Sequence, residues 1–260
     1  MILAIDCGNT NIVFAVFGED GVLRGDWRSS TDHNRTADEF GLWLMQLLRL
    51  AGIDPAQIQG AILATVVPAT LFNLKTMCRK YFNCDPMVVG EPGVQLGIQN
   101  LVDHPEEVGA DRLVNAVAAG KTYRAPMIVI DFGTATTFDV IDGDGNYRGG
   151  VIAPGVNLSV EALYMAAAKL PRVAIGRPER VIGTGTVAAM KSGVYWGYVA
   201  MIEGLVERIK KEFGADMDVI ATGGLAPLFT DAVACIKRAD LDLTLRGLYA
   251  VYRLNAKKDR

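Results

Sequence analysis

Two short segments of this chain carry acidic, amide and hydroxyl side chains where the pattern predicts tight turns between strands. The first, the Asp6 turn, consists of Asp6, Cys7, Gly8, Asn9, Thr10 and Asn11. Its glycine would let the backbone approach a ligand, and the polar side chains that follow offer donors to anionic oxygens. Asp6 is suited to hold a divalent cation, directly or through water, against phosphate groups. The segment predicts a phosphate-binding turn, although a plain structural turn is the commoner use of Asp-x-Gly.

The second segment, the Asp131 turn, spans residues 131–137 and repeats the same arrangement with several hydroxyl groups. Asp131 and Thr134 are the members to which we assign function. Thr136 and Thr137 are better explained as residues that favour a β-strand. Two such turns facing across a cleft could hold a polyphosphate.

The two turns lie at matching places in an internal repeat. Residues 2–25 read ILAIDCGNTNIVFAVFGEDGVLRG, and residues 128–149 read IVIDFGTATTFDVIDGDGNYRG. When Asp6 is aligned with Asp131, the glycines two positions later coincide, and an Asp-Gly turn follows in both after a one-residue gap. A chance match of two hairpins is the alternative, but these shared features favour duplication.

Each half therefore opens with a three-stranded antiparallel meander, followed by helices and further strands. The predicted helices lie at 36–51, 69–81, 109–123, 156–168, 186–212 and 243–253, and the later strands at 61–67, 87–89 and 218–221. The alanine-rich helix at 109–123 carries the boundary between two α/β lobes, residues 1–117 and residues 118–260.

The helix predicted at 109–123 opens with Gly109, Ala110, Asp111 and Arg112. Asp111 could accept a proton from an attacking hydroxyl, and Arg112 could pair with a carboxylate or a phosphoryl oxygen. An aspartate at a helix start is more often a cap, so both roles stay open. A further turn at 221–226 joins a strand to a helix with two adjacent glycines, which would let a nucleoside lie against the backbone.

Composition excludes several classes of function. The formal net charge of −3 over 260 residues gives no bulk attraction to nucleic acid or to an anionic membrane. The N-terminal segment reads as a strand rather than an export signal, and no apolar run approaches the roughly 20 residues of a spanning helix. The four cysteines have no zinc-like spacing, which fits reduced thiols in a cytoplasm. With only two histidines, carboxylates must carry the proton chemistry.

Together these segments resemble the superfamily of acetate and sugar kinases, 70-kDa heat-shock chaperones and actin. Within it, the chain is similar to the type III pantothenate kinases along essentially its full length. The motifs that carry this narrower resemblance are D-x-G-N-T-N at 6–11, G-A-D-R at 109–112, D-F-G-T-A-T-T at 131–137, G-G-x-I-x-P-G at 149–155 and G-T-G-T at 183–186. The resemblance implies two duplicated ribonuclease-H-like, actin-like ATPase lobes, each with a mixed sheet flanked by helices.

The resemblance also implies a reaction and a set of roles. Pantothenate would be phosphorylated by ATP to 4'-phosphopantothenate, the first step of coenzyme A synthesis, with Asp111 as general base. The Asp6 turn and Thr134 would contact ATP, and residues 109–112 with Thr186 would line the pantothenate pocket. Asp131 would hold a monovalent cation, potassium or ammonium, while Mg²⁺ accompanies ATP. Thr186 could equally serve as an ordinary helix cap.

The segment before Asp103 departs from the family pattern. A tyrosine that helps to form the substrate pocket is often found there, whereas this chain has Asn100, Leu101 and Val102. The family also implies a homodimer with substrate sites at the interface. The apolar side chains of the helix predicted at 186–212 would suit such an interface, or a core within one chain.

Two other functions compete with this reading. One is a non-catalytic accessory factor in gene regulation, as the related Bvg accessory factors are described; loss of Asp111 or of either turn would favour it, and all are present. The other is a kinase of the same fold for a sugar or an N-acyl amino sugar, against which the segment 109–112 argues.

Overall fold

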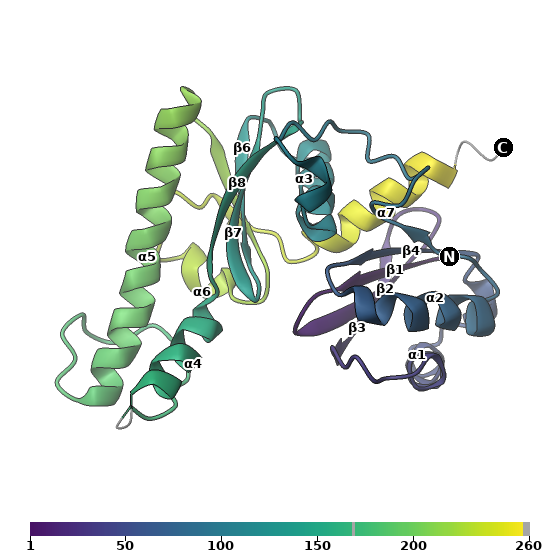
Figure 1. Ribbon diagram of the computed structural model, residues 1–260, viewed down its shortest axis with the longest axis horizontal. Coiled ribbons are helices and arrows are strands. Elements are labelled where there is room, and N and C mark those ends of the chain that lie inside the picture. The colour runs from purple at the N-terminus through teal and green to yellow at the C-terminus, as the bar shows by residue number, and fades with distance from the viewer. Residues whose placement is uncertain (168–169, 257–260) are drawn as a thin grey trace. The chain divides into compact units, whose positions relative to one another are not determined.

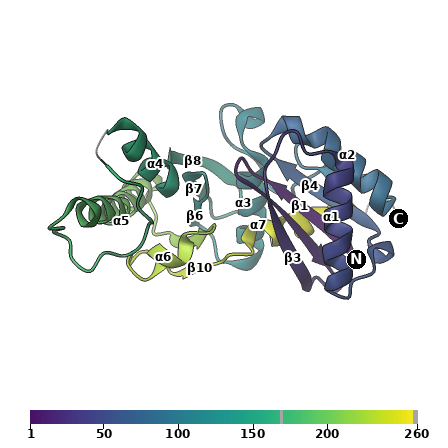
Figure 2. The same ribbon diagram turned by 90° about the horizontal axis from the view of Figure 1, so that it is seen from below.

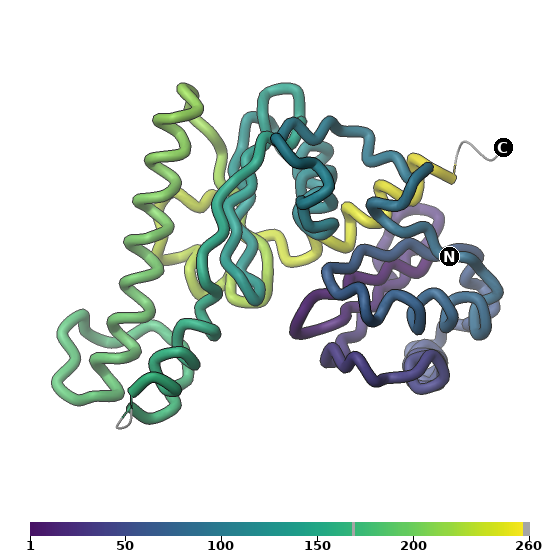
Figure 3. Tube along the Cα trace, viewed as in Figure 1, coloured from purple at the N-terminus to yellow at the C-terminus, as the bar shows by residue number. Residues whose placement is uncertain are grey.

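The computed structural model describes residues 1–167 and 170–256, and its chain divides into two compact units (Figure 1). The first unit contains Met1–Thr122 and the segment that begins at Leu243, and the second contains Tyr123–Asp242. The division differs from the contiguous lobes 1–117 and 118–260 expected from the sequence, because the C-terminal helix belongs to the first unit. Figure 3 follows that helix, in yellow, back to the side of the teal helix α3.

The first unit is a five-stranded mixed sheet in the order β3-β2-β1-β4-β5. Its strands are β1 (Ile2–Cys7), β2 (Asn11–Phe17), β3 (Leu23–Ser30), β4 (Gly60–Thr65) and β5 (Met87–Val88). Its helices are α1 (Ala37–Leu50), α2 (Pro68–Phe82), α3 (Ala110–Thr122) and α7 (Leu243–Ala256), with short 3₁₀ turns at Pro55–Gln57 and Pro105–Glu107.

Successive side chains of β1 point to opposite faces of this sheet, and each face has its own hydrophobic core. Leu3 and Ile5 pack with α1 and α2, while Ala4 faces the cluster that contains α3 and α7. Figure 2 shows the two helix pairs on opposite sides of the strands. Helix α1 begins where the sequence places it, because Thr36 and Glu39 form a capping box.

The second unit is a five-stranded mixed sheet in the order β10-β9-β6-β7-β8. Its strands are β6 (Met127–Phe132), β7 (Ala135–Ile141), β8 (Tyr147–Pro154), β9 (Asp218–Thr222) and β10 (Arg238–Ala239), and its helices are α4 (Val156–Ala166), α5 (Thr186–Phe213) and α6 (Ala226–Thr230). Ile128, Ile130 and Phe132 of β6 pack with the buried side of α5. The aromatic rings of Tyr195 and Tyr198 belong to this core.

The strand orders confirm the predicted repeat. Each unit has a meander of three antiparallel strands, with a fourth strand added parallel to the first, β4 beside β1 and β9 beside β6. The aligned Asp-Gly turns match in conformation as well, since Gly21 and Gly145 have φ values of 81° and 84°. A left-handed turn of this kind favours glycine at both places.

The predicted elements are confirmed with small shifts at their ends. Helix α4 ends at Ala166 rather than 168, a position outside the described residues, and α7 continues to Ala256. The helix expected after the turn at 221–226 is the short helix α6, whereas β10 was not predicted, because two residues give no periodicity to read. In the described part of the chain, no helix has the length and apolar character needed to cross a membrane.

Candidate active site

The Asp6 turn joins β1 to β2 at the carboxyl end of β1. The backbone N–H of Gly8 donates to the carbonyl of Asn11 at 3.0 Å, which closes the turn. Thr31, the residue after β3, supports it twice: its N–H donates to the Thr10 carbonyl at 3.0 Å and its hydroxyl to the Gly8 carbonyl at 2.6 Å. The side of the turn that carries Asn9, Thr10 and Asn11 is exposed. These three polar residues therefore lie on the solvent side of the turn.

Cys7 differs from the other members of the turn. Its side chain is 1% exposed, and its sulfur lies 3.1 Å from the hydroxyl oxygen of Thr70. Burial raises the pKa of the thiol, so the group stays protonated and unreactive at neutral pH. Only the backbone of Cys7 can take part in binding a ligand.

The carboxyl end of β1 also carries the start of α3. The Val66 N–H donates to the Cys7 carbonyl at 3.1 Å, which places Val66 directly beside the Asp6 turn. A methyl group added at Gly109 would lie 3.5 Å from Val66 Cγ1 and 2.6 Å from Asp111 Oδ1. Asp111 therefore lies at the same end of the first sheet as the Asp6 turn, where the carboxyl ends of parallel strands usually hold ligands.

Asp111 is partly buried in the first turn of α3. Its Oδ1 accepts a hydrogen bond from the Arg112 N–H at 2.8 Å, which orients the carboxylate. Burial raises the pKa of the Asp111 carboxyl, outweighing the hydrogen bond from Arg112, which lowers it. A carboxylate with a raised pKa is a stronger base than an exposed aspartate, as a proton acceptor requires.

The second unit contains the equivalent turn. The Gly133 N–H donates to the Ala135 carbonyl at 3.0 Å, which makes the Asp131 turn one residue shorter than its counterpart, as the alignment gap predicts. Gly223, after β9, lies against Asp131: an added Cβ would be 2.5 Å from Asp131 Oδ1 and 2.7 Å from the Phe132 carbonyl oxygen. The Gly-Gly segment 221–226 thus approaches the Asp131 turn inside one unit.

Gly155, the residue after β8, approaches the same turn from the other side. A Cβ at this position would lie 2.0 Å from the Thr134 carbonyl oxygen, too close for any side chain. The turn is held between the ends of two strands. The backbone that carries Thr134 has little freedom to move as a result.

The remaining hydroxyl groups have different surroundings. Thr136 is fully buried, and its hydroxyl has no hydrogen-bond partner within the described residues, while Thr137 donates to Asp139 Oδ2 at 3.1 Å. Both lie in β7, as expected of strand-forming residues. Thr186 is the first residue of α5 and is exposed; Gly185 is the capping residue, so Thr186 is not the cap.

The oxygen atoms in the two units suit hard cations. Within the described residues, no group of three or more His, Cys, Asp or Glu gathers as a metal site. Asp6 and Asp131 each supply a carboxylate, and the rest of a coordination shell would come from backbone, hydroxyl, phosphate and water oxygens. This donor set fits magnesium and potassium better than zinc, which prefers nitrogen and sulfur ligands.

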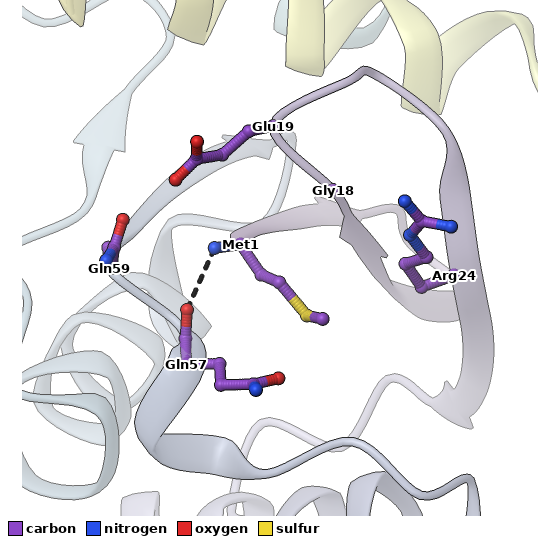
Figure 4. A pocket seen from close by; sticks show the side chains of 6 residues that line it. All are labelled: Met1, Gly18, Glu19, Arg24, Gln57 and Gln59. Carbon is purple, nitrogen blue, oxygen red and sulfur yellow. Dashed lines mark hydrogen bonds between the residues drawn. The ribbon is translucent and has the colours of Figure 1, made fainter.

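The structure has two other concave regions. The one in Figure 4 is at the opposite end of β1 from the Asp6 turn, where the N-terminal amine donates to the Gln57 carbonyl at 2.8 Å. It is lined by Met1, Gly18, Glu19, Arg24, Gln57 and Gln59 and contains no predicted site residue. An apolar groove of about 570 Å³ lies between α4 and α5.

Comparison with known proteins identifies the family. The family model described as type III pantothenate kinase matches residues 2–208. The chain belongs to the type III pantothenate kinase family. A type III pantothenate kinase of Paramagnetospirillum magneticum is 67% identical over 256 residues, covering 98% of both chains.

Solved structures show the fold. A Campylobacter jejuni protein described as a Baf family transcriptional activator matches with a TM-score of 0.59 at 19% identity, covering 98% of this chain and 99% of the other. A Sinorhizobium meliloti protein described as a 2-dehydro-3-deoxygalactonokinase matches with a TM-score of 0.58 at 17% identity, covering 98% and 96%. The predicted pair of ribonuclease-H-like, actin-like lobes is confirmed.

Sequence reasoning missed Thr31, and it quoted Gly155 only as part of the motif at 149–155, without a role in supporting a turn. Thr31 and Gly155 follow the third strand of their respective meanders and each contacts the turn between the first two. Extending the repeat alignment to the end of the third strand would have pointed to both positions. Thr31 belongs to no motif and is not distinctive enough to stand out alone.

Proposed function

We propose that this kinase transfers the γ-phosphoryl group of ATP to the terminal hydroxyl of pantothenate, yielding 4'-phosphopantothenate and ADP, the first step of coenzyme A biosynthesis. The observation that carries the proposal is the 67% identity to a type III pantothenate kinase over 98% of the chain. The position of Asp111 beside the Asp6 turn supports it, because acceptor and phosphate sites must adjoin for in-line transfer.

In this mechanism the Asp6 turn and Thr134 bind phosphate oxygens of ATP. Residues 109–112 and Thr186 bind pantothenate, with Arg112 pairing with its carboxylate or with a phosphoryl oxygen. Asp111 takes the proton from the hydroxyl as its oxygen attacks the γ-phosphorus. The bond from phosphorus to the β–γ bridging oxygen breaks, and ADP leaves with those electrons.

Two cations complete the proposal. Mg²⁺ would be held near Asp6 together with the phosphates, and potassium or ammonium near Asp131. Such ions offset the negative charge of the triphosphate. The other steps rest on the protein's own groups, which orient the substrates and accept the proton.

We also propose a homodimer with substrate sites at the interface. Tyr195 and Tyr198 of α5 no longer support it, because these aromatic residues lie in the core of their own unit. The apolar groove between α4 and α5 supports the proposal instead, together with the exposed Leu158 and Met165 of α4, which are 49% and 69% exposed. Light scattering on the purified protein tests it, and a monomer at micromolar concentration would contradict it.

We expect the enzyme to act in the cytoplasm, without nucleic-acid or membrane partners. All four cysteines are free thiols, which fits a reducing compartment. The net charge of −3 offers no general attraction to polyanions.

The test is ADP release by the purified protein with magnesium and ATP, with and without pantothenate, in potassium and then in sodium buffer. Turnover that requires pantothenate and falls in sodium is the expected result. A panel containing a hexose and an N-acyl amino sugar tests the substrate class. Turnover with a sugar in place of pantothenate, or none with any acceptor, would overturn the proposal.

A further inference from the structure

Thr31 is absent from every set of expected site residues, yet it makes two hydrogen bonds to the Asp6 turn. It directly follows β3, the strand beside β2 (Figure 1). Its hydroxyl donates to the Gly8 carbonyl at 2.6 Å, and its N–H donates to the Thr10 carbonyl at 3.0 Å. Two carbonyl groups of the turn are therefore directed toward one residue.

The orientation of these carbonyls has a consequence for the donors of the turn. A trans peptide is planar, so its C=O and the following N–H point in opposite directions. Since the Gly8 carbonyl is held by the Thr31 hydroxyl, the Asn9 N–H points away from Thr31. Asn9 is exposed, so this donor is available to a ligand. If the Asn9 N–H pointed toward Thr31 instead, it could not donate to an anion on the exposed side of the turn.

The repeat supplies an independent parallel. In the second unit the residue that follows the third strand is Gly155, and its backbone packs against the Thr134 carbonyl. The third strand of each meander thus supports the turn between the first two. The Thr31 hydroxyl supports the turn in the first unit, and the close backbone contact of Gly155 supports it in the second.

We propose that Thr31 is a positioning residue for ATP: its hydroxyl fixes the Gly8–Asn9 peptide so that the Asn9 N–H is directed at a phosphate oxygen. The inference deepens the proposed function and rests on its assignment of ATP phosphates to the Asp6 turn. Without the hydroxyl the Gly8–Asn9 peptide loses the hydrogen bond that fixes its carbonyl, although the other two bonds of the turn remain, and the Asn9 donor must be ordered when nucleotide binds. The loss falls on nucleotide affinity rather than on pantothenate.

The experiment measures the Kd of Mg-ATP by titration calorimetry without pantothenate, for wild type, Thr31→Val and Thr31→Ser. Valine keeps the shape and removes the hydroxyl, whereas serine keeps the hydroxyl. One hydrogen bond of ordinary strength corresponds to a Kd for Thr31→Val about 3- to 10-fold above wild type. Thr31→Ser should stay within about twofold, and the KM for pantothenate should not change in either variant.

Ser29→Ala is the matched control, because Ser29 lies two residues before Thr31, in β3, and its hydroxyl donates to the Ser30 carbonyl and accepts from the Arg35 guanidinium without contacting the turn. It should bind ATP as wild type does. If Thr31→Val does not fold, Thr31→Ala removes the same hydroxyl and takes its place. A purely structural role would lower the melting temperature and leave the Kd for ATP unchanged.

The outcomes separate this inference from the proposed function. A Kd for Thr31→Val equal to wild type, or a Thr31→Ser as weak as Thr31→Val, overturns the role of the hydroxyl and leaves pantothenate phosphorylation standing. Absence of pantothenate turnover in a wild type that binds ATP defeats the proposed function, while the comparison of the Thr31 variants still holds. A wild type that does not bind ATP defeats both.

Discussion

Asp111 combines two properties that rarely occur together in an aspartate at a helix start. It accepts a hydrogen bond from the N–H of the next residue in the first turn of α3, and burial raises its pKa. A cap alone gains nothing from a raised pKa, since a neutral carboxyl is a poorer acceptor for the helix amides. The partly desolvated position is the feature that favours a proton-transfer role.

Replacing Asp111 by asparagine should abolish most activity without loss of folding. The amide keeps the shape and the acceptor for the Arg112 N–H but cannot take a proton. We expect kcat to fall by about 100-fold or more, the usual contribution of general base catalysis, with little change in the Kd for ATP. Asp144→Asn, at an exposed turn of the second unit, is the control and should keep normal turnover. Near-normal kcat in Asp111→Asn would remove the base assignment.

The raised pKa of Asp111 also predicts the pH dependence. Activity requires the ionised carboxylate, so kcat/KM should decline as the pH falls through a value above the ordinary aspartate pKa of about 3.9. A pH–rate profile checks this. An acid limb at or below that ordinary value would contradict the assignment, provided the protein stays folded over the range.

Activity should rise as Asp111 ionises, whereas the contribution of Asp111 to the stability of the fold should fall. A carboxyl whose pKa is raised by folding binds its proton more tightly in the folded state, so its contribution to stability is complete at low pH and is lost as the pH rises through the raised pKa. Asp111→Asn should therefore be at least as stable as wild type at pH 7 and lose that advantage near pH 4. Urea unfolding at the two pH values measures this difference.

At the scale of elements, the site depends on where strands end. Gly223 leaves β9 with a φ of 86° and approaches Asp131 and Phe132, whereas its neighbour Gly224 has open space around its Cβ position. Glycine is therefore found at these two adjacent positions for different reasons. One is required by packing and backbone conformation, and the other leaves room for a ligand.

Alanine at these two positions should separate the two reasons. Gly223→Ala forces a left-handed residue with a side chain against Asp131, and we expect it to lower the free energy of unfolding by about 2 kcal/mol or more. Gly224→Ala should leave stability nearly unchanged and raise the KM for ATP if a nucleoside lies there. Thermal unfolding and initial-rate kinetics on both variants give the readouts. Equal stability of the two variants would contradict the distinction.

The sequence predicted the elements well because each carries a local signal. Thr36 and Glu39 form the capping box that starts α1, and the Asp-Gly turns with their left-handed glycines fix the hairpins. The supports of the turns had no such signal. Thr31 is an ordinary threonine until the sheet brings the end of β3 beside the Asp6 turn, and that proximity is a product of tertiary structure.

At the scale of the whole molecule, the unit to which α7 belongs could not be read from the sequence. Its apolar positions Leu245, Leu248 and Val251 predict one buried face, but periodicity does not say which sheet will cover it. In the structure they pack with Val114 and Val117 of α3 in the first unit. The chain therefore passes between the units twice, after Thr122 and after Asp242.

The two segments in which the chain passes between the units are joined by contacts within the second unit. The hydroxyl of Tyr123 donates to Asp240 Oδ2, and the guanidinium of Arg238 lies 5.4 Å from the centre of the Tyr123 ring. Asp240 is only 8% exposed, so its carboxylate has lost most of its contact with water. A buried carboxylate depends on its hydrogen-bond donors far more than an exposed one does.

Tyr123→Phe should therefore destabilise the protein by about 1–3 kcal/mol, since it removes a donor from a buried charged acceptor. Tyr81→Phe is the matched control: its hydroxyl bonds to Asp38 Oδ1 at 2.8 Å in an exposed pair, where the expected cost is below about 1 kcal/mol. Chemical denaturation of both variants, followed by far-ultraviolet circular dichroism, makes the comparison. If the two substitutions cost the same, burial of Asp240 does not strengthen the contact, and the link between the two passages contributes no more than a surface hydrogen bond.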